Sequence, residues 1–415
     1  MLNSNESYVK LLTDWNEKKT FKNKSIVIED DTLRDGLQSA LLRIPNYFEK
    51  KELVTLAHAS RIKYVMLGFP GASEDAYHEC RLLVQFIRDM QWPLVPRLLG
   101  RANQSDMAAI CRLQEETGVP LQADFFINIC ALRLKVEGWN LATITQMIHQ
   151  ASEQLDRHGV SYSISLEDAT RSDTSIIEKM LCTIVNTKAI AIVLCDTVGA
   201  CLPSGVANLL RFVKKTIAAH NSHIFQWWHG HNDRGLALAN ALCALDHGID
   251  GISGTFLGIG ERSGNICIEQ IMLHLNQYYG SAYCLDSARQ YCSLLSRYTE
   301  YTMPINQPLF GNQSFTTTAG THIRALEKAK RFGTGAHDLL YSSVAAHDLG
   351  RQQQIMLGPM SGRSAVKSVL EQIGESYDEK KISTLFNYFK KIQKPITVQE
   401  FIDIYPSLLT ERDST

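Results

Sequence analysis

The 415-residue sequence predicts an α/β protein, a closed (β/α)8 barrel (TIM barrel) followed by a mainly helical C-terminal region. Short apolar runs rich in β-branched residues alternate with amphipathic stretches of helical periodicity, which is typical of a parallel sheet with helices outside it. Eight such units occupy about 255 residues, which is the size of a (β/α)8 barrel. An open doubly wound sheet is the alternative, but no G-x-G-x-x-G sequence follows the first apolar run.

The predicted elements follow in order along the chain. Residues 1–24 are polar and charged and predict an N-terminal arm, and residues 25–280 predict the barrel. Its predicted strands are residues 25–29, 64–68, 94–98, 121–127, 161–166, 189–194, 224–228 and 251–255. The predicted helices between them are residues 46–60, 74–90, 104–116, 141–157, 174–186, 204–219 and 236–247. The alternation then stops, and residues 281–415 predict a second region with helices at 283–302, 320–331, 361–373, 378–392 and 397–404.

The composition excludes several classes of protein. The formal net charge is -1, so no basic field favours a nucleic acid or an anionic membrane as partner. Ten cysteines without a CxxC pair are typical of free intracellular thiols. No apolar run resembles a signal peptide or approaches the roughly 20 residues of a membrane span. We therefore expect a cytoplasmic protein with no nucleic-acid and no membrane partner.

Four polar residues at three strand ends predict a divalent metal site. In a barrel of this type the active residues follow the C-terminal ends of the strands. His229 and His231 follow the seventh strand, where residues i and i+2 project from the same face. Asp35 follows the first strand, and Asn265 lies in the glycine-rich stretch after the eighth. An isolated His-x-His is more often an ordinary polar pair, but two nitrogens and two oxygens together suit Mg, Mn or Zn and leave positions for a chelating substrate.

Three further strand-end residues suit the same site. Arg34, beside Asp35, has the planar guanidinium that stabilises carboxylates and enolate-like oxygens, although it could equally form a surface ion pair. Glu167 follows the fifth strand and could be a general base or could cap the next helix. Thr197 follows the sixth strand, and its hydroxyl could hold a carboxylate.

Three motifs, in this order, resemble a known family. They are Asp31-Thr32-Leu33-Arg34-Asp35-Gly36, His229-x-His231-Asn232-Asp233 and Gly258-x-Gly260-Glu261-Arg262-x-Gly264-Asn265. They resemble the metal-dependent Claisen condensing enzymes, namely 2-isopropylmalate, homocitrate and citramalate synthases, which are related to HMG-CoA lyase. The resemblance implies an acyltransferase that condenses acetyl-CoA with a 2-oxo acid and then hydrolyses the thioester. A 2-isopropylmalate synthase-like activity, as in leucine biosynthesis, is the favoured version.

The resemblance also implies roles for individual residues. It assigns the metal ligands to Asp35, His229, His231 and Asn265, and substrate binding to Arg34, Gln38 and Thr197. Catalysis is assigned to Arg34, Glu167, His322 and Tyr341. In the family the C-terminal region reaches the active site of the partner subunit, so we expect a homodimer.

Departures from the family pattern leave the 2-oxo acid open. The glutamate expected before Gly68-Phe69-Pro70 is absent, Asp124 stands where a histidine is usual, Ile129-Cys130 replaces a Thr-Ser pair, and Thr316-Thr317-Thr318 lacks a histidine. Homocitrate or citramalate synthase activity is therefore an alternative. Met66, Ile127, Ile129 and Cys130 predict an apolar pocket, which disfavours a dicarboxylic 2-oxo acid.

Two alternative functions belong to other classes of protein. An HMG-CoA lyase-type C–C lyase would carry a cysteine in the glycine-rich loop, and residues 257–265 contain none. A non-catalytic barrel that binds a metabolite would be favoured by degraded metal ligands, but all four are present. Because the sequence ends at Thr415, we expect no leucine-binding regulatory domain.

Overall fold

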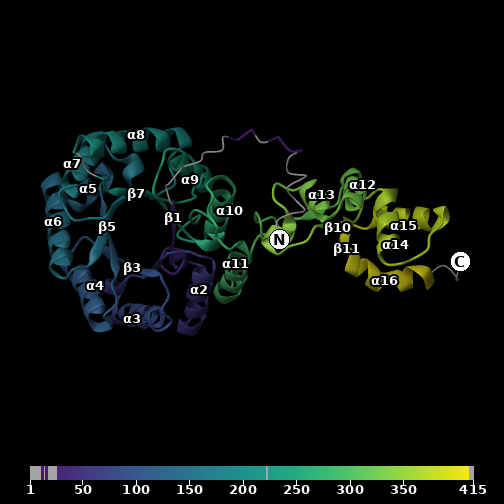
Figure 1. Cartoon of the computed structure of the whole chain (residues 1–415), viewed down its shortest axis with the longest axis horizontal. Coiled ribbons are helices and arrows are strands. Elements are labelled where there is room, and N and C mark those ends of the chain that lie inside the picture. Colours follow the sequence, from purple (N-terminus) through teal and green to yellow (C-terminus); the bar gives the residue numbers. More distant parts are fainter. Residues whose placement is uncertain (1–10, 14, 17–25, 221–222, 411–415) are drawn as a thin grey trace. The chain divides into compact units, whose positions relative to one another are not determined.

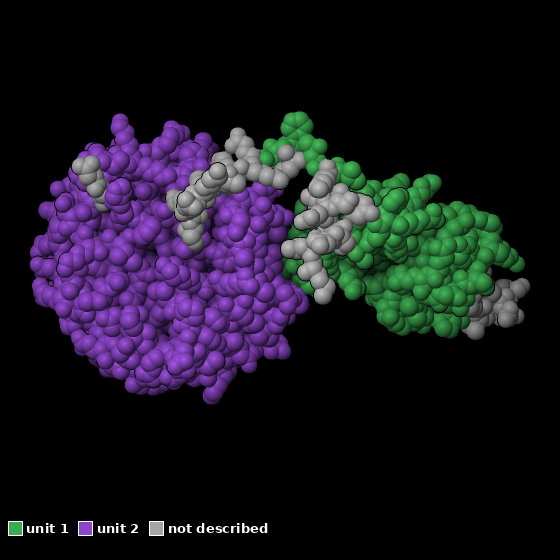
Figure 2. Space-filling view, viewed as in Figure 1, with its two compact units in different colours: residues 1–17, 303–415 green, residues 18–302 purple. Residues whose placement is uncertain are grey.

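The computed structural model describes residues 11–13, 15–16, 26–220 and 223–410, whose elements are labelled in Figure 1. The chain divides into two compact units, coloured separately in Figure 2. One unit contains the described residues from Ile26 to Thr302, and the other contains residues 303–410 with the few described residues near the N-terminus. Most of the predicted N-terminal arm, residues 1–24, lies outside the described residues.

The first unit is a closed barrel of eight parallel strands. The strands pair in chain order, and the barrel closes where β1 pairs with β8. They are β1 (Val27–Asp30), β2 (Tyr64–Gly68), β3 (Val95–Arg101), β4 (Gln122–Asn128), β5 (Ser161–Glu167), β6 (Ala191–Asp196), β7 (Phe225–Gly230) and β8 (Gly251–Gly254). The predicted (β/α)8 barrel is thus confirmed, with strand ends that differ from the predicted ones by a few residues.

Helices surround this barrel, and five of them begin at a side-chain cap. Side chains of Asn46, Ser73, Asn103, Asn140 and Asp173 each accept a backbone N–H of the first helical turn, which stabilises the start of a helix. The helices are α2 (Tyr47–Ala59), α3 (Glu74–Asp89), α4 (Gln104–Thr117), α5 (Ala131–Glu137), α6 (Leu141–Arg157), α7 (Thr174–Ile184), α8 (Pro203–Ala219), α9 (Ala237–Asp246), α10 (Ile268–Tyr278) and α11 (Leu285–Thr299). Of these, α5 and α10 have no counterpart among the predicted helices. No helix in the described part of the chain combines the length and apolar character that crossing a membrane requires.

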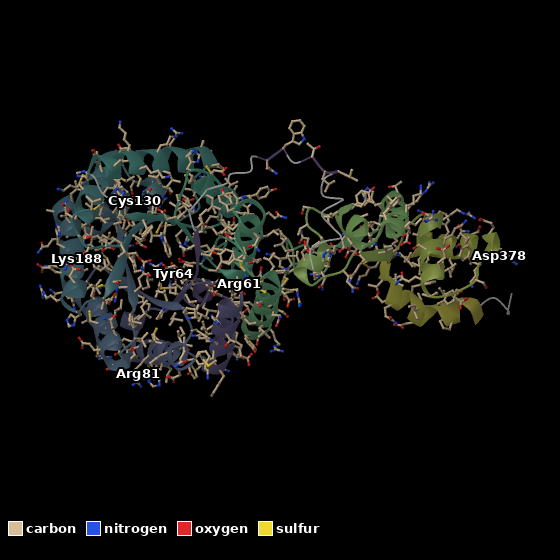
Figure 3. The ribbon with its side chains drawn as sticks, viewed as in Figure 1. Arg61, Tyr64, Arg81, Cys130, Lys188 and Asp378 are labelled. Atoms are coloured by element: carbon tan, nitrogen blue, oxygen red, sulfur yellow. The ribbon has the colours of Figure 1, made fainter. Side chains whose placement is uncertain are left out.

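The barrel interior is apolar toward the N-terminal ends of the strands. Trp227 on β7 packs with Ala191, Val193 and Cys195 on β6, and Tyr64, labelled in Figure 3, packs edge-on against it with 5.1 Å between ring centroids. Because alternate residues of a strand face the same side, the next inward residue of β7 after Trp227 is His229. His229 therefore faces the barrel interior one inward position beyond the apolar cluster around Trp227.

The barrel unit extends beyond the predicted boundary at residue 280. Helix α11 packs against α2, and the backbone N–H of Arg43 donates to the carbonyl of Thr299. The unit accordingly continues to Thr302.

The second unit is mainly helical, as predicted, and also contains a small sheet. Its helices are α12 (Gly320–Ala329), α13 (Thr334–Leu339), α14 (Arg363–Gln372), α15 (Glu379–Lys391) and α16 (Val398–Thr410). The sheet has the order β11-β10-β9, with β9 (Thr316–Thr317), β10 (Gln354–Leu357) and β11 (Ile396–Thr397). Its core contains Ile323, Val366, Leu385, Phe389 and Phe401. This unit therefore has a hydrophobic core of its own.

Candidate active site

A cavity of about 220 Å³ opens among the C-terminal ends of the barrel strands. All but one of the barrel residues predicted for the site line it, namely Arg34, Asp35, Gln38, Glu167, Thr197, His229 and His231. Asn265 does not line the cavity but contacts Asp35 through a hydrogen bond. The barrel thus brings together residues from the first, fifth, sixth, seventh and eighth strand ends.

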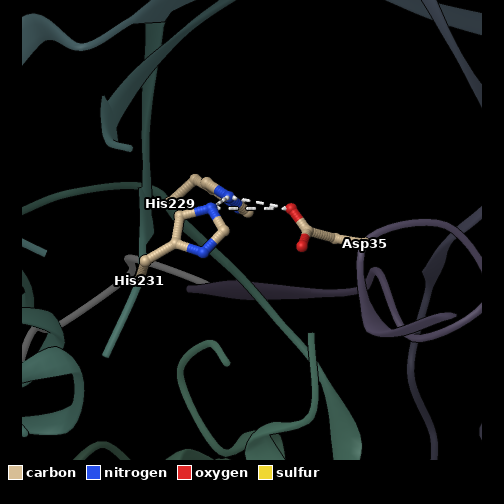
Figure 4. A group of neighbouring side chains, drawn as sticks. All are labelled: Asp35, His229 and His231. Atoms are coloured by element: carbon tan, nitrogen blue, oxygen red, sulfur yellow. Dashed lines mark hydrogen bonds and ion pairs between the residues drawn. The ribbon is translucent and has the colours of Figure 1, made fainter. Parts of the chain in front are cut away.

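Asp35, His229 and His231 form a buried cluster of potential metal ligands. One ligand atom from each lies within 4.8 Å of the other two. The two imidazole Nε2 atoms are 3.4 Å apart, and Oδ2 of Asp35 is 3.4 Å from Nε2 of His229 and 3.7 Å from Nε2 of His231. Figure 4 shows the carboxylate facing both rings. Two nitrogens and one carboxylate that converge in this way are a donor set for a divalent cation.

Asn265 supplies the fourth predicted ligand beside this cluster. Its Nδ2 donates to Oδ1 of Asp35 over 3.0 Å, and its backbone forms an isolated β-bridge with His231. Its Oδ1 is buried and has no hydrogen-bond partner among the described residues. A buried amide oxygen normally has a partner, so this oxygen fits the role of a metal ligand.

A glycine is required next to this asparagine. Gly260 has φ +155°, and a Cβ atom there would lie 2.2 Å from Nδ2 of Asn265 and 3.2 Å from Oδ1 of Asp35. The loop after β8 can therefore approach the two ligands only because residue 260 has no side chain.

The protonation states within the cluster also suit a metal ion. Burial alone would raise the pKa of Asp35, but Arg34 and the two histidines lower it well below its usual range. Burial and the neighbouring His229 lower the pKa of His231 to about 4. At neutral pH this cluster thus offers a carboxylate and at least one neutral imidazole, which are the forms that bind metals. Burial would lower the pKa of His229, but its hydrogen bond with Asp35 and the charges of Asp35 and Asp31 together raise it.

Arg34 is held in a fixed position beside the cluster. Its Nε donates to Oδ1 of Asp31 and its Nη1 donates to Oδ2 of Asp35, both over 2.9 Å. Only 14% of its side chain is exposed. A guanidinium locked in this way at the cavity wall can stabilise negative charge without first having to reorganise.

Thr197 and Glu167 line the cavity from neighbouring strand ends. The hydroxyl oxygen of Thr197 accepts the backbone N–H of Asp168 over 2.8 Å, so its own hydrogen can be donated to a ligand. Glu167 is the last residue of β5 and is half-buried. Gln38 is exposed and belongs to the rim of the cavity.

Two predicted catalytic residues lie in the second unit. His322 on α12 stacks on Tyr341, with 4.1 Å between ring centroids and 20° between the planes. Both side chains are exposed. The two residues that the resemblance pairs are therefore neighbours, and their role in catalysis stays a prediction.

The four residues predicted to form an apolar pocket do not line the cavity. Met66, Ile127, Ile129 and Cys130 are buried and do not line the cavity. On β4 the inward side chains belong to residues 122, 124 and 126, so Ile127 packs on the other face of the sheet. The apolar wall is formed instead by Phe69, Leu99, Phe126, Val193 and Cys195.

The sequence analysis did not identify several residues that line the cavity or hold Arg34 in position. Asp31 orients Arg34, and Ser165 and Glu261 line the cavity. Ser165 carries a signal, because it lies two residues before Glu167 on the same face of the strand. Asp124, which stands where the family usually has a histidine, lines the cavity.

Residues 25–292 match the HMGL-like family along most of the barrel unit. The chain belongs to the HMGL-like family. It is 28% identical to a 2-isopropylmalate synthase of Geobacillus sp. (strain WCH70) over 91% of this chain and 73% of that protein. It is 27% identical to homocitrate synthase AksA of Methanocaldococcus jannaschii over 94% of this chain and 92% of that protein. These matches confirm the resemblance predicted from the three motifs.

Solved structures of other proteins have the same barrel fold. The HMG-CoA lyase of Bacillus subtilis superposes with a TM-score of 0.59 at 18% identity, over 69% of this chain and 97% of that one. The carboxyl transferase domain of Rhizobium etli pyruvate carboxylase has a TM-score of 0.53 at 15% identity, over 76% and 56%. At these identities the likeness concerns the fold alone.

Proposed function

We propose that this HMGL-like protein is an acyltransferase that condenses acetyl-CoA with a 2-oxo acid and then hydrolyses the thioester, in the manner of 2-isopropylmalate synthase. The observation that carries this proposal is the buried Asp35, His229 and His231 cluster, with Arg34 locked beside it at the wall of a small-molecule cavity. Relatives named 2-isopropylmalate synthase and homocitrate synthase align with most of the chain, which supports the same reaction class.

The cluster fits a divalent cation, Mg, Mn or Zn, held by Asp35, His229, His231 and Asn265. The partnerless amide oxygen of Asn265 and the low pKa of His231 support this assignment. When bound, such an ion acts as a Lewis acid that polarises the keto group of the 2-oxo acid.

The protein side chains bind the substrates and stabilise charge. The Thr197 hydroxyl donates to the carboxylate of the 2-oxo acid, with Gln38 at the rim. Arg34 stabilises the oxygen on which negative charge develops as the methyl group of acetyl-CoA is deprotonated and attacks the keto carbon. Glu167 lies at the cavity and is proposed as an acid–base group. His322 and Tyr341 complete the acid–base chemistry from the second unit, across a homodimer, and their role, the dimer and the cytoplasmic location stay predictions.

The test is the release of free CoA. The full chain with acetyl-CoA and Mg²⁺, Mn²⁺ or Zn²⁺ is offered pyruvate, 2-oxobutyrate, 2-oxoisovalerate, 2-oxoglutarate and phenylpyruvate in turn. We expect thiol release with at least one 2-oxo acid, none without it, and loss of the activity after a chelator removes the metal. No release across the panel by metal-loaded protein would refute the proposal.

HMG-CoA cleavage is the second candidate, because the barrel shares the fold of HMG-CoA lyase. The loop of residues 257–265 has no cysteine, which disfavours the lyase reaction. Acetoacetate formation from HMG-CoA, measured in the same preparation, would favour it instead.

A further inference from the structure

An ion network lies buried beneath the cavity, in the middle of the barrel. Arg97 on β3 is fully buried, and its guanidinium stacks on Trp227 at 4.6 Å from the ring centroid. Its Nη1 donates to Glu29 and its Nη2 donates to Ser163. The same Nη2 is 3.4 Å from Oδ2 of Asp124. The guanidinium thus donates to Glu29 and Ser163 and also lies near the carboxylate of Asp124.

Asp124 is a member of this network that lies at the cavity wall. Its side chain lines the cavity wall, although the residue is only 5% exposed. The hydroxyl of Ser165 donates to the carboxylate, lying 2.9 Å from Oδ1 and 3.0 Å from Oδ2. A carboxylate can accept about four hydrogen bonds, so one hydroxyl and one distant guanidinium leave acceptor capacity on the cavity side.

The residues around Asp124 determine which groups a substrate side chain would contact in the cavity. Leu99, Phe126 and Val193 line the same cavity and are apolar. A 2-oxo acid held at Arg34 and Thr197 would therefore pass its side chain along apolar groups toward a fixed carboxylate.

A fixed, incompletely paired carboxylate discriminates strongly among side chains. A second carboxylate on the substrate would face like charge in a place from which water is largely excluded. A methyl group would bury acceptor atoms without a partner, which is unfavourable. A hydroxyl would donate to the carboxylate and is neutral, so it satisfies both conditions.

We propose that Asp124 is a specificity-determining residue, and that the site selects a 2-oxo acid whose side chain ends in a hydrogen-bond donor such as a hydroxyl, and not in a methyl or a carboxylate. This inference rests on the proposed function, because it assumes that the cavity binds a 2-oxo acid. It goes beyond that function by naming the class of 2-oxo acid and the residue that recognises its side chain.

The experiment compares three 2-oxo acids of matched length that differ in the terminal group. They are 2-oxopentanoate with a methyl, 4-hydroxy-2-oxobutyrate with a hydroxyl and oxaloacetate with a carboxylate. Their binding to the full chain loaded with Mg²⁺ is measured by calorimetry without acetyl-CoA. The hydroxy acid should bind about tenfold more tightly than the methyl analogue, as for a hydrogen bond to a charged group, and oxaloacetate should bind most weakly.

The variant Asp124→Asn tests whether this residue carries the preference. The amide keeps an acceptor for Ser165, and Arg97 keeps Glu29 as a partner, so the network can persist. The hydroxyl preference should fall to less than about threefold and oxaloacetate should gain affinity, because the charge is removed. Asp106→Asn is the matched control, since Asp106 on α4 is a buried acid that is also paired with an arginine and does not line the cavity. It should leave the order unchanged.

The outcomes separate this inference from the proposed function. A methyl analogue or oxaloacetate that binds most tightly, no binding of any of the three, or an undiminished hydroxyl preference of about tenfold in Asp124→Asn would each overturn the role of Asp124. CoA release is measured independently. If the predicted binding order holds without CoA release by any 2-oxo acid, the proposed reaction fails and the selectivity stands. If CoA is released with the opposite preference, the reaction stands and the selectivity fails.

Discussion

His231 is the residue at which the proposed metal site can be tested with least damage to the barrel, because it lies just beyond the end of β7. Even partners that only orient a metal ligand contribute about 10–100-fold to affinity, so His231→Ala should weaken metal binding at least about a hundredfold and abolish turnover. Metal content and CoA release measure the two effects. The midpoint of thermal unfolding without metal should change little.

The matched control for this change is His149→Ala, which removes an exposed histidine on α6. It should keep both metal affinity and turnover. Metal-dependent activity of normal size in His231→Ala would contradict the assignment of the cluster.

Asp30 gives a prediction about stability and pH. Burial raises its pKa to about 6, although hydrogen bonds from Thr32 oppose the shift. The folded chain therefore binds this proton more tightly than the unfolded chain, where the pKa of Asp is about 4. The contribution of Asp30 to stability is thus greatest below about pH 4, declines as the pH rises to about 6 and is constant above it.

Asp30→Asn should remove this decline and keep an acceptor for Thr32. Relative to the native protein, the variant should gain about 2 kcal/mol between pH 4.5 and pH 7.5 in denaturant unfolding. Asp286→Asn is the control on α11, because Arg289 lowers the pKa of this half-exposed carboxyl, so any trend should be small and opposite. A pH-independent difference at Asp30 would show that its carboxyl is not protonated in the folded protein.

In the loop after β8, the position of Asn265 depends on the absence of a side chain at residue 260. A Cβ at residue 260 would collide with the amide of Asn265. Gly260→Ala should displace this ligand by about 1 Å, and a misplacement of that size lowers kcat on the order of a hundredfold. Steady-state CoA release, together with metal titration, measures the change.

The matched control is Gly118→Ala. Gly118 ends α4 with φ +66°, and a Cβ added there would meet no atom within 4 Å, so alanine adds strain without crowding. It should cost about 1 kcal/mol of stability and leave kcat unchanged. If both variants lose the same activity, backbone strain and not the position of Asn265 is responsible.

The helices and strands also show which parts of the fold and of the site the sequence could predict. Strand and helix alternation located all eight barrel strands, and the strand-end rule brought Asp35, His229 and His231 together. The inward face of β4 could not be predicted, because Phe125, Phe126 and Ile127 are all apolar and a strand buried on both faces shows no alternation. The two-residue strands β9 and β11 are too short to leave a periodic signal. Arg97 was a signal that the sequence analysis did not use. A charged residue within a buried strand requires a partner, so it indicated a buried ion pair.

At the scale of the whole molecule, the proposed chemistry is divided between two units. The cluster and Arg34 belong to the barrel, whereas His322 and Tyr341 belong to the second unit. Removing an acid–base group typically lowers the rate by 10²–10⁴, so His322→Ala should lower kcat about that much and change the KM for the 2-oxo acid little. His347→Ala removes another exposed histidine of the same unit and should leave kcat unchanged. An unchanged rate in His322→Ala would remove this residue from the chemistry.

Mixing two inactive variants tests whether that division crosses a dimer. If each active site combines a barrel from one subunit with His322 from the other, a mixed dimer of His231→Ala and His322→Ala contains one site in which both residues are intact. Random reassortment of subunits in a two-fold dimer should then restore about a quarter of the native activity. The two proteins are exchanged under mild denaturation, refolded together and assayed for CoA release, and each variant treated alone is the control. If each site is instead built from one subunit, the mixed dimer contains one site damaged at His231 and one damaged at His322, and the mixture stays inactive.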